Sequence, residues 1–154
     1  MIFCDTSAVA KLYFAEKESP VVRGRLESEE QDCIAEVIRV ELHGAFHRQL
    51  REKMWTRDQF MTAIRQLTND DLGGFWSWLP VENQVIEAAA KTYMILLETV
   101  FLQGADCLHL VKALHNGFTE IYTYDKNQTA VLWLWASGQF RRKPPPSIVA
   151  MSLR

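Results

Sequence analysis

Apolar residues follow two alternating patterns along the 154-residue chain. Short continuous apolar runs predict strands, and they lie at 2–4, 33–37, 75–79, 120–124 and, as a possible final edge strand, 147–151. Longer segments with an apolar residue every three or four positions predict helices. They span 7–16, a stretch after Pro20, 39–53, 56–68, 83–102, 106–115 and 128–135, with Gly104 and Gly117 expected to end the fifth and sixth.

The alternation of strands and helices predicts an α/β fold in three layers, α/β/α. A central parallel sheet of four to five strands is expected, with helices on both of its faces. The length fits one domain over 1–154. Its last part, 141–154, combines a basic run with three prolines and is expected to be an extended tail with that possible edge strand. In such sheets ligands bind beyond the carboxyl ends of the strands.

Charge and composition narrow the function only slightly. The formal net charge of −2 gives no overall attraction to nucleic acid or to acidic membranes. Asp5 interrupts the first apolar run, and the apolar stretch 85–102 carries three charges, so neither a signal peptide nor a membrane span is expected. The three cysteines, Cys4, Cys33 and Cys107, read as buried free thiols. A cytoplasmic protein is therefore expected.

Four acids fall where this fold would gather them at one edge of the sheet. Asp5 and Asp125 each follow a predicted strand directly. Asp106 begins a predicted helix, and Glu41 lies beside the apolar stripe of another, where a carboxylate is costly unless something pairs with it. Singly, the aspartates can be helix caps or turn residues. Glu41 alone can be an exposed charge.

Together, the acids predict a bound metal ion. Two carboxylates about 4 Å apart repel each other by about 4 kcal/mol at an effective dielectric constant near 20. Four of them in one pocket would largely protonate or separate without a cation. A site made only of oxygen ligands suits Mg²⁺ or Mn²⁺, which also favour phosphate groups of a substrate. Phosphoryl chemistry is therefore expected.

The stretches around these acids resemble, in order, the motifs of PIN-domain ribonucleases, and most of all the VapC toxin family of toxin–antitoxin modules. They read MIFCDTSAVAKLY, RVELHGAF, GADCLHLVKAL and IYTYDKN. By this resemblance Asp5, Glu41, Asp106 and Asp125 form an acidic quartet that is both catalytic and metal-binding, with Asp5 and Asp106 the main ligands. Thr6 matches the small hydroxyl residue that follows the first aspartate.

The resemblance implies a PIN-like fold and a Mg²⁺- or Mn²⁺-dependent endoribonuclease that cleaves RNA with a metal-activated water. It also implies a homodimer that a cognate antitoxin protein inhibits. Two departures from the family pattern are the additional acid Glu36, which competes with Glu41 for its role, and the aromatic stretch LGGFWSWLP. The alternatives are a structure-specific DNA nuclease, another metal phosphohydrolase, and a non-catalytic PIN-like binding module.

Other polar residues near the predicted edge are candidates for substrate binding. Thr6, Arg39, Lys126 and Asn127 are expected to contact RNA, although ordinary surface positions explain the last three equally well. His43 and His47 are one helical turn apart but face away from Glu41, so a zinc site is not expected there. His109 lies one turn after Asp106 and is expected to pack or to donate a supporting hydrogen bond.

Overall fold

The computed structural model describes residues 2–29, 32–136 and 149–151. Within these ranges the strands form one parallel sheet in the order β3-β2-β1-β4-β5. The strands are β1 (Ile2–Cys4), β2 (Asp32–Ala35), β3 (Trp76–Leu79), β4 (Glu120–Tyr122) and β5 (Val149–Met151). The first strand is central, because Phe3 is in register with residue 33 of β2 on one side and with Ile121 of β4 on the other.

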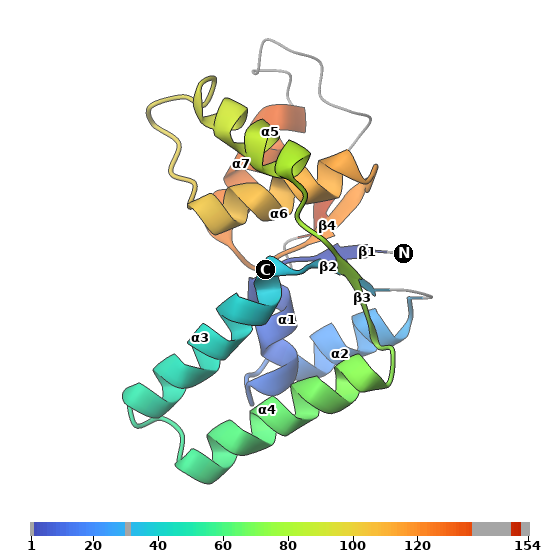
Figure 1. Cartoon of the computed structure of the whole chain (residues 1–154), viewed down its shortest axis with the longest axis vertical. Coiled ribbons are helices and arrows are strands. Elements are labelled where there is room, and N and C mark those ends of the chain that lie inside the picture. Colours follow the sequence, from blue (N-terminus) through green and yellow to red (C-terminus); the bar gives the residue numbers. More distant parts are fainter. Residues whose placement is uncertain (1, 30–31, 137–148, 152–154) are drawn as a thin grey trace.

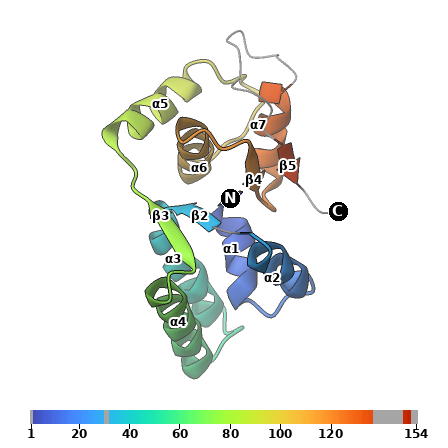
Figure 2. The ribbon, with the colours of Figure 1, turned by 90° about the vertical axis from the view of Figure 1, so that its right-hand side faces the viewer.

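Helices cover both faces of this sheet (Figures 1 and 2). One face carries α1 (Thr6–Tyr13), α2 (Ser19–Glu27), α3 (Val37–Arg51) and α4 (Arg57–Leu72). The other carries α5 (Asn83–Tyr93), α6 (Gly104–His115) and α7 (Lys126–Ala136). The predicted three-layer α/β/α architecture is confirmed, and so is the parallel sheet.

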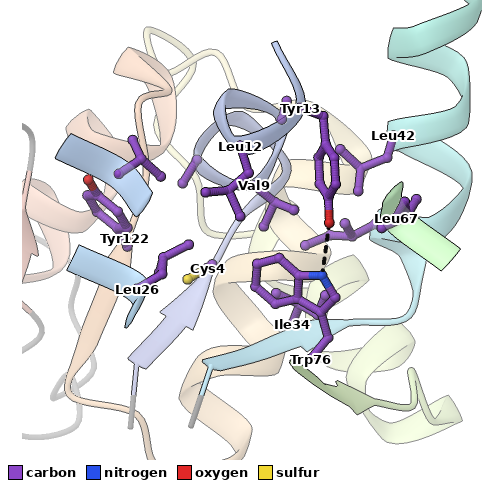
Figure 3. Close-up of a cluster of buried hydrophobic side chains, with 14 of the residues drawn as sticks. Cys4, Val9, Leu12, Tyr13, Leu26, Ile34, Leu42, Leu67, Trp76 and Tyr122 are labelled. Atoms are coloured by element: carbon purple, nitrogen blue, oxygen red, sulfur yellow. Dashed lines mark hydrogen bonds between the residues drawn. The ribbon is translucent and has the colours of Figure 1, made fainter. Parts of the chain in front are cut away.

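Alternate residues of the short strands supply the two cores between these layers. Ile2 and Cys4 pack with Val9 against the helices on one face, whereas Phe3 packs into the core on the other. In the first core, shown in Figure 3, the indole nitrogen Nε1 of Trp76 donates a hydrogen bond to the hydroxyl of Tyr13 (3.1 Å). Successive apolar residues in β1 are thus explained by burial on both sides of a central strand.

Most predicted elements are present with shifted ends. The segment predicted to start at Thr56 begins as expected, because Thr56 and Gln59 form a reciprocal capping box, but α4 continues to Leu72. The first helix stops at Tyr13 rather than at residue 16, since Phe14 is already extended. The second strand ends at Ala35, and α3 begins two residues later.

The helix predicted over 83–102 is wrong in its second half. The α5 helix ends at Tyr93, and Gly104 begins α6 instead of ending a helix. The chain turns back after α5, so that the Tyr93 hydroxyl donates to the backbone oxygen of Leu102 (2.9 Å) and Leu102 is only 6% exposed. A continuous helix would lose this contact. The turn also leaves the side chain of Met94 82% exposed.

Several sequence predictions concern segments at the limits of the described residues. Val149–Met151 is an edge strand, as predicted, and it pairs with β4. The remainder of 141–154, which includes the first two residues of the predicted strand 147–151, lies outside the described residues. Cys4 and Cys107 are buried, as predicted, and the side chain of Cys33 lies outside what is described. Among the helices of the described ranges, none is long and apolar enough to cross a membrane.

Candidate active site

Asp5 lies where β1 ends and α1 begins, and it has two structural roles at once. Its Oδ1 accepts a hydrogen bond from the backbone N–H of Ala8 (3.0 Å), so it is the N-cap of α1. The same carboxylate, only 1% exposed, lies at the carboxyl edge of the central strand. The capping interpretation and the site interpretation of Asp5 therefore hold together.

Polar side chains from three parts of the chain donate to the Asp5 carboxylate. The hydroxyl of Ser7 donates to Oδ1 (2.8 Å) and that of Thr123 to Oδ2 (2.9 Å), and the Gln128 amide Nε2 also donates to Oδ2 (2.8 Å). Burial nevertheless raises the pKa of Asp5, although the charge of His109 and the hydrogen bonds from Ser7, Ala8 and Thr123 act in the opposite direction. A proton or a cation at this carboxylate is therefore favoured.

Asp106 lies in the first turn of α6, close to Asp5. The N-cap of α6 is Gln103, so the sequence alternative in which Asp106 caps the helix is wrong. Its Oδ1 accepts a hydrogen bond from Nε2 of Gln128 (3.0 Å), the same nitrogen that donates to Asp5. Burial and the nearby carboxylate of Asp125 raise the pKa of Asp106, against the effect of the Gln128 hydrogen bond.

Asp125 follows β4 and completes the acidic side of a cleft. Its Oδ1 accepts hydrogen bonds from the backbone N–H groups of Asn127 (2.7 Å) and Gln128 (2.8 Å) at the start of α7. The cleft has a volume of about 350 Å³. The described residues that line it are Asp5, Thr6, Ser7, Ala10, Lys11, Phe14, Glu16, Ala45, Arg48, Asp106, Tyr124 and Asp125.

Glu41 is connected to this cleft through a hydrogen-bonded network. Its Oε2 accepts a hydrogen bond from the hydroxyl of Thr6 (2.5 Å) and lies 2.6 Å from Nε2 of His109. Burial acts to raise the pKa of Glu41, but the hydrogen bond and charge of His109, with the bond from Thr6, outweigh it and lower the pKa. Glu41 is therefore held ionised beside the cleft. The described lining of the cleft includes Thr6 but not Glu41 itself.

The chemistry of the donors fits a hard divalent cation, but with fewer carboxylates than the sequence predicts. Within 2–29, 32–136 and 149–151, no three histidine, cysteine, aspartate or glutamate side chains form a group that could hold a metal ion. Asp5 and Asp106 do meet at one amide nitrogen, and the other amide atom, Oε1 of Gln128, is buried without a hydrogen-bond partner among these residues. Carboxylate and amide oxygens are the ligands that Mg²⁺ and Mn²⁺ prefer. A metal ligand role for all four acids stays a prediction.

The residues predicted to contact the substrate do not all lie in the cleft. Thr6 lines the cleft, whereas Arg39, Lys126 and Asn127 are not among its described lining residues. Arg39 forms an ion pair with Asp71 (2.8 Å) and stacks over the Trp78 ring at 3.7 Å. RNA binding by these residues stays a prediction.

The positions of the histidines agree with the sequence analysis. His43 and His47 are exposed, and His109 is fully buried with the expected supporting contact to Glu41. Glu36, the competing acid, is exposed at the start of α3. The helix phase that put Glu41 at the edge of the buried stripe is therefore confirmed.

Sequence reasoning missed several residues of the site. Ser7 and Thr123 each lie two residues from an acid, and Gln128 lies three residues after Asp125, so their proximity to the aspartates was a usable signal. Arg48 was missed as well, although it follows Glu41 by seven residues, two turns along the same face of α3. No local pattern showed that Gln128 would reach across to Asp5.

The fold and this site together define an α/β protein with an acidic cleft at the carboxyl edge of a parallel sheet. The family model described as PIN domain matches residues 2–133, and the chain belongs to that family. No curated protein sequence matches the chain.

Similar solved structures include toxins and toxin–antitoxin complexes. VapC20 of Mycobacterium tuberculosis, a toxin that cleaves the sarcin–ricin loop, superposes with a TM-score of 0.66 at 15% identity, covering 85% of this chain and 95% of that chain. VapBC2 of Rickettsia felis, bound to a DNA fragment from its promoter, has a TM-score of 0.63 at 13% identity, with 99% and 100% covered. FitAcB of Neisseria gonorrhoeae has a TM-score of 0.61 at 18% identity, with 84% and 92% covered. At these identities the likeness concerns the fold.

Proposed function

We propose that this protein is an endoribonuclease that depends on Mg²⁺ or Mn²⁺ and is the toxin of a toxin–antitoxin pair. One observation carries the proposal. The carboxylates of Asp5 and Asp106, which lie far apart in the sequence, share one amide donor beside an acidic cleft at the carboxyl edge of the sheet. Membership of the PIN domain family supports a nuclease function for that cleft.

In this proposal the acidic side chains bind the cation and the basic side chains bind the RNA substrate. Asp5 and Asp106 bind the metal ion, with Asp125 and Glu41 beside them as further acids. The chemistry supplied by such an ion, when bound, is activation of a water molecule for attack on phosphorus and neutralisation of charge on the phosphodiester. Asp5 and Asp106 gain from it directly, because burial disfavours their charged forms in the metal-free protein.

The basic side chains of the cleft are suited to the RNA phosphates. Lys11 and Arg48 line the same cleft as the three aspartates. The ammonium of Lys11 lies over the Tyr124 ring, 4.6 Å from its centre, and pairs with Glu16 at 2.5 Å. Arg48 is exposed on α3, where its guanidinium can bind a phosphate through two parallel hydrogen bonds. These contacts would position the scissile bond without selecting a base sequence.

The partners follow from the toxin part of the proposal. VapBC2 and a toxin–antitoxin complex from Klebsiella pneumoniae are among the similar structures, which supports a cognate antitoxin as a partner of this chain. A homodimer is also proposed, and exposed apolar side chains such as Met94 (82%) and Phe101 (64%) are available for an interface. We expect the protein to act in the cytoplasm, where its RNA substrate would be found.

The direct test is cleavage of total cellular RNA by the purified protein in Mn²⁺ and in EDTA. Cleavage is expected with the metal, and it should stop on chelation and in Asp5→Asn and Asp106→Asn. The matched control is Glu98→Gln, which neutralises an exposed acid after α5 and should cleave like the unmodified protein.

Three outcomes would contradict the proposal. Cleavage that continues in EDTA and in Asp5→Asn would exclude the metal mechanism. Cleavage of structured DNA but not of RNA would favour the DNA nuclease. A protein that neither binds Mn²⁺ in a calorimetric titration nor cleaves any nucleic acid would favour the non-catalytic module.

A further inference from the structure

Gln128 connects the two central acids of the site. It is the third residue of α7, and its side chain is only 1% exposed. Its Nε2 donates to Oδ2 of Asp5 at 2.8 Å and to Oδ1 of Asp106 at 3.0 Å. A primary amide nitrogen carries two hydrogens, so both are used, and two carboxylates are held at a single neutral donor.

The other end of the amide lacks a partner. Oε1 of Gln128 is buried and accepts no hydrogen bond from the residues that the structure describes. Buried polar atoms are nearly always paired, so an unpaired carbonyl oxygen beside two carboxylates needs an explanation. Across the described ranges, aspartate, glutamate, histidine and cysteine side chains also supply no group of three that could hold a metal. A site built on Asp5 and Asp106 therefore needs a ligand of another kind.

We propose that Gln128 is that ligand, through Oε1, and that its Nε2 occupies the place of the cation while the protein is metal-free. Side-chain amide oxygens of asparagine and glutamine are ordinary ligands of hard divalent cations. Half a turn about the last side-chain torsion exchanges the amide oxygen and nitrogen with little change in shape. The N–H groups stabilise the two carboxylates against each other until the cation arrives, and the carbonyl oxygen then faces the cation with them.

The charge of the site agrees with this arrangement. Asp5 and Asp106 together carry the charge that one divalent cation compensates, and the amide between them is neutral. Asp125 is a further acid of the same cleft, so a glutamate at 128 would add one more negative charge to an already repulsive metal-free site. This inference rests on the proposed function, because it assumes that the cleft binds a divalent cation. It adds Gln128 to the site, a residue that is not one of the four acids predicted from the sequence.

The test is a calorimetric titration of the full chain with Mn²⁺, comparing the unmodified protein with Gln128→Met and Gln128→Glu. Gln128→Met keeps the length of the side chain and removes the amide, so the affinity for Mn²⁺ should fall about tenfold or more. Gln128→Glu should raise the affinity and lower the melting temperature in EDTA. Gln84→Met and Gln84→Glu, at an exposed position in the first turn of α5, are matched controls and should change neither quantity.

The opposite sign overturns the inference. If the amide is only a hydrogen-bond donor that competes with the cation, Gln128→Met will bind Mn²⁺ as tightly as the unmodified protein or more tightly. If the unmodified protein binds no Mn²⁺, the proposed function fails as well, so the two failures are distinguishable.

A measurement on the unmodified protein keeps the inference testable even if Gln128→Met does not fold. In protein with isotope-labelled glutamine side chains, Mg²⁺ should shift the Gln128 carbonyl carbon resonance and release its NH₂ group from hydrogen bonding. Titration with Mg²⁺ that leaves this NH₂ group hydrogen-bonded to the two carboxylates would overturn the inference.

Discussion

Neutralising Asp5 or Asp106 is expected to abolish metal-dependent activity in both cases. The two variants should nevertheless differ in stability, because the two carboxylates have different structural roles. In Asp106→Asn the new amide oxygen can still accept the hydrogen bond from Gln128, and the negative charge beside Asp125 and Asp5 is removed. In Asp5→Asn the helix cap is kept, because asparagine caps as well as aspartate. Because the amide oxygen keeps the cap at the Oδ1 position, the amide nitrogen then replaces Oδ2 and faces the Thr123 hydroxyl and the Gln128 amide nitrogen, which both donate to Oδ2 in the unmodified protein.

The magnitudes follow from these contacts. Two charges about 4 Å apart repel by about 4 kcal/mol at an effective dielectric constant of 20 and by about 1 kcal/mol in water. Asp106 is half-buried, so we expect Asp106→Asn to raise the free energy of unfolding of the metal-free protein by about 1 kcal/mol. That gain raises the melting temperature by roughly 2–4 °C for a chain of this size. In Asp5→Asn, one unpaired buried donor costs about 1–3 kcal/mol. This cost offsets or exceeds the free energy gained because a charged carboxylate is no longer buried.

Urea unfolding in EDTA at pH 7 measures this difference, with Glu98→Gln as the control for charge removal at an exposed site. The pH dependence provides a second measurement. Because the pKa of Asp106 is raised by folding, its ionised form is disfavoured in the native state above that pKa. The gain from Asp106→Asn is therefore present at neutral pH. It should disappear as the pH falls through the raised pKa toward the ordinary value of 3.8, where the unmodified protein is protonated as well.

Two results would refute this reasoning. Asp106→Asn could unfold at a lower urea concentration than the unmodified protein, which would mean that the Asp106 carboxylate stabilises the metal-free fold despite its acidic neighbours. Alternatively, Asp5→Asn could be at least as stable as Asp106→Asn, which would mean that the donors around Asp5 contribute little.

Four further results are expected. Tyr13→Phe leaves the buried indole N–H of Trp76 unpaired and should lower the free energy of unfolding by about 1–2 kcal/mol, with RNA cleavage unchanged; equal urea midpoints would contradict the role of this bond. His109→Leu removes the partner that lowers the pKa of Glu41, so the acid limb of the pH–activity profile should move to higher pH, and an unmoved limb would argue against coupling. Arg48→Ala should weaken RNA binding and reduce its salt dependence, measured as Kd against ionic strength, with no change in Mn²⁺ affinity. Saturating Mn²⁺ at a hundred times its Kd should stabilise the unmodified protein by about 2.7 kcal/mol relative to EDTA, which a thermal melt would detect.

The overall fold was predictable because its determinants are local. Apolar runs flanked by helical periodicity identified every strand of the sheet, and Thr56 with Gln59 identified the start of α4. The positions of Asp5 and Asp125 at strand ends followed from the same pattern. A parallel sheet then requires both residues to lie at one edge, whatever the order of the strands.

The error after α5 has a physical cause that no local pattern contains. Apolar side chains continue at helical spacing beyond Tyr93, but the chain turns there because Leu102 is buried against the core and its carbonyl accepts from Tyr93. The free energy of that contact depends on where α6 lies, which is a property of the folded molecule.

The sequence by itself determined that this protein is a three-layer α/β fold with aspartates at the carboxyl edge of its sheet, because hydrophobic period and helix capping act over a few residues. Only the tertiary structure decided which groups the acids meet. Glu41 pairs with His109 and Thr6, Arg39 with Asp71, and Gln128 holds Asp5 and Asp106 together. These pairings join residues far apart along the chain, so they depend on helix phase and strand order, which become defined only when both cores pack against the sheet.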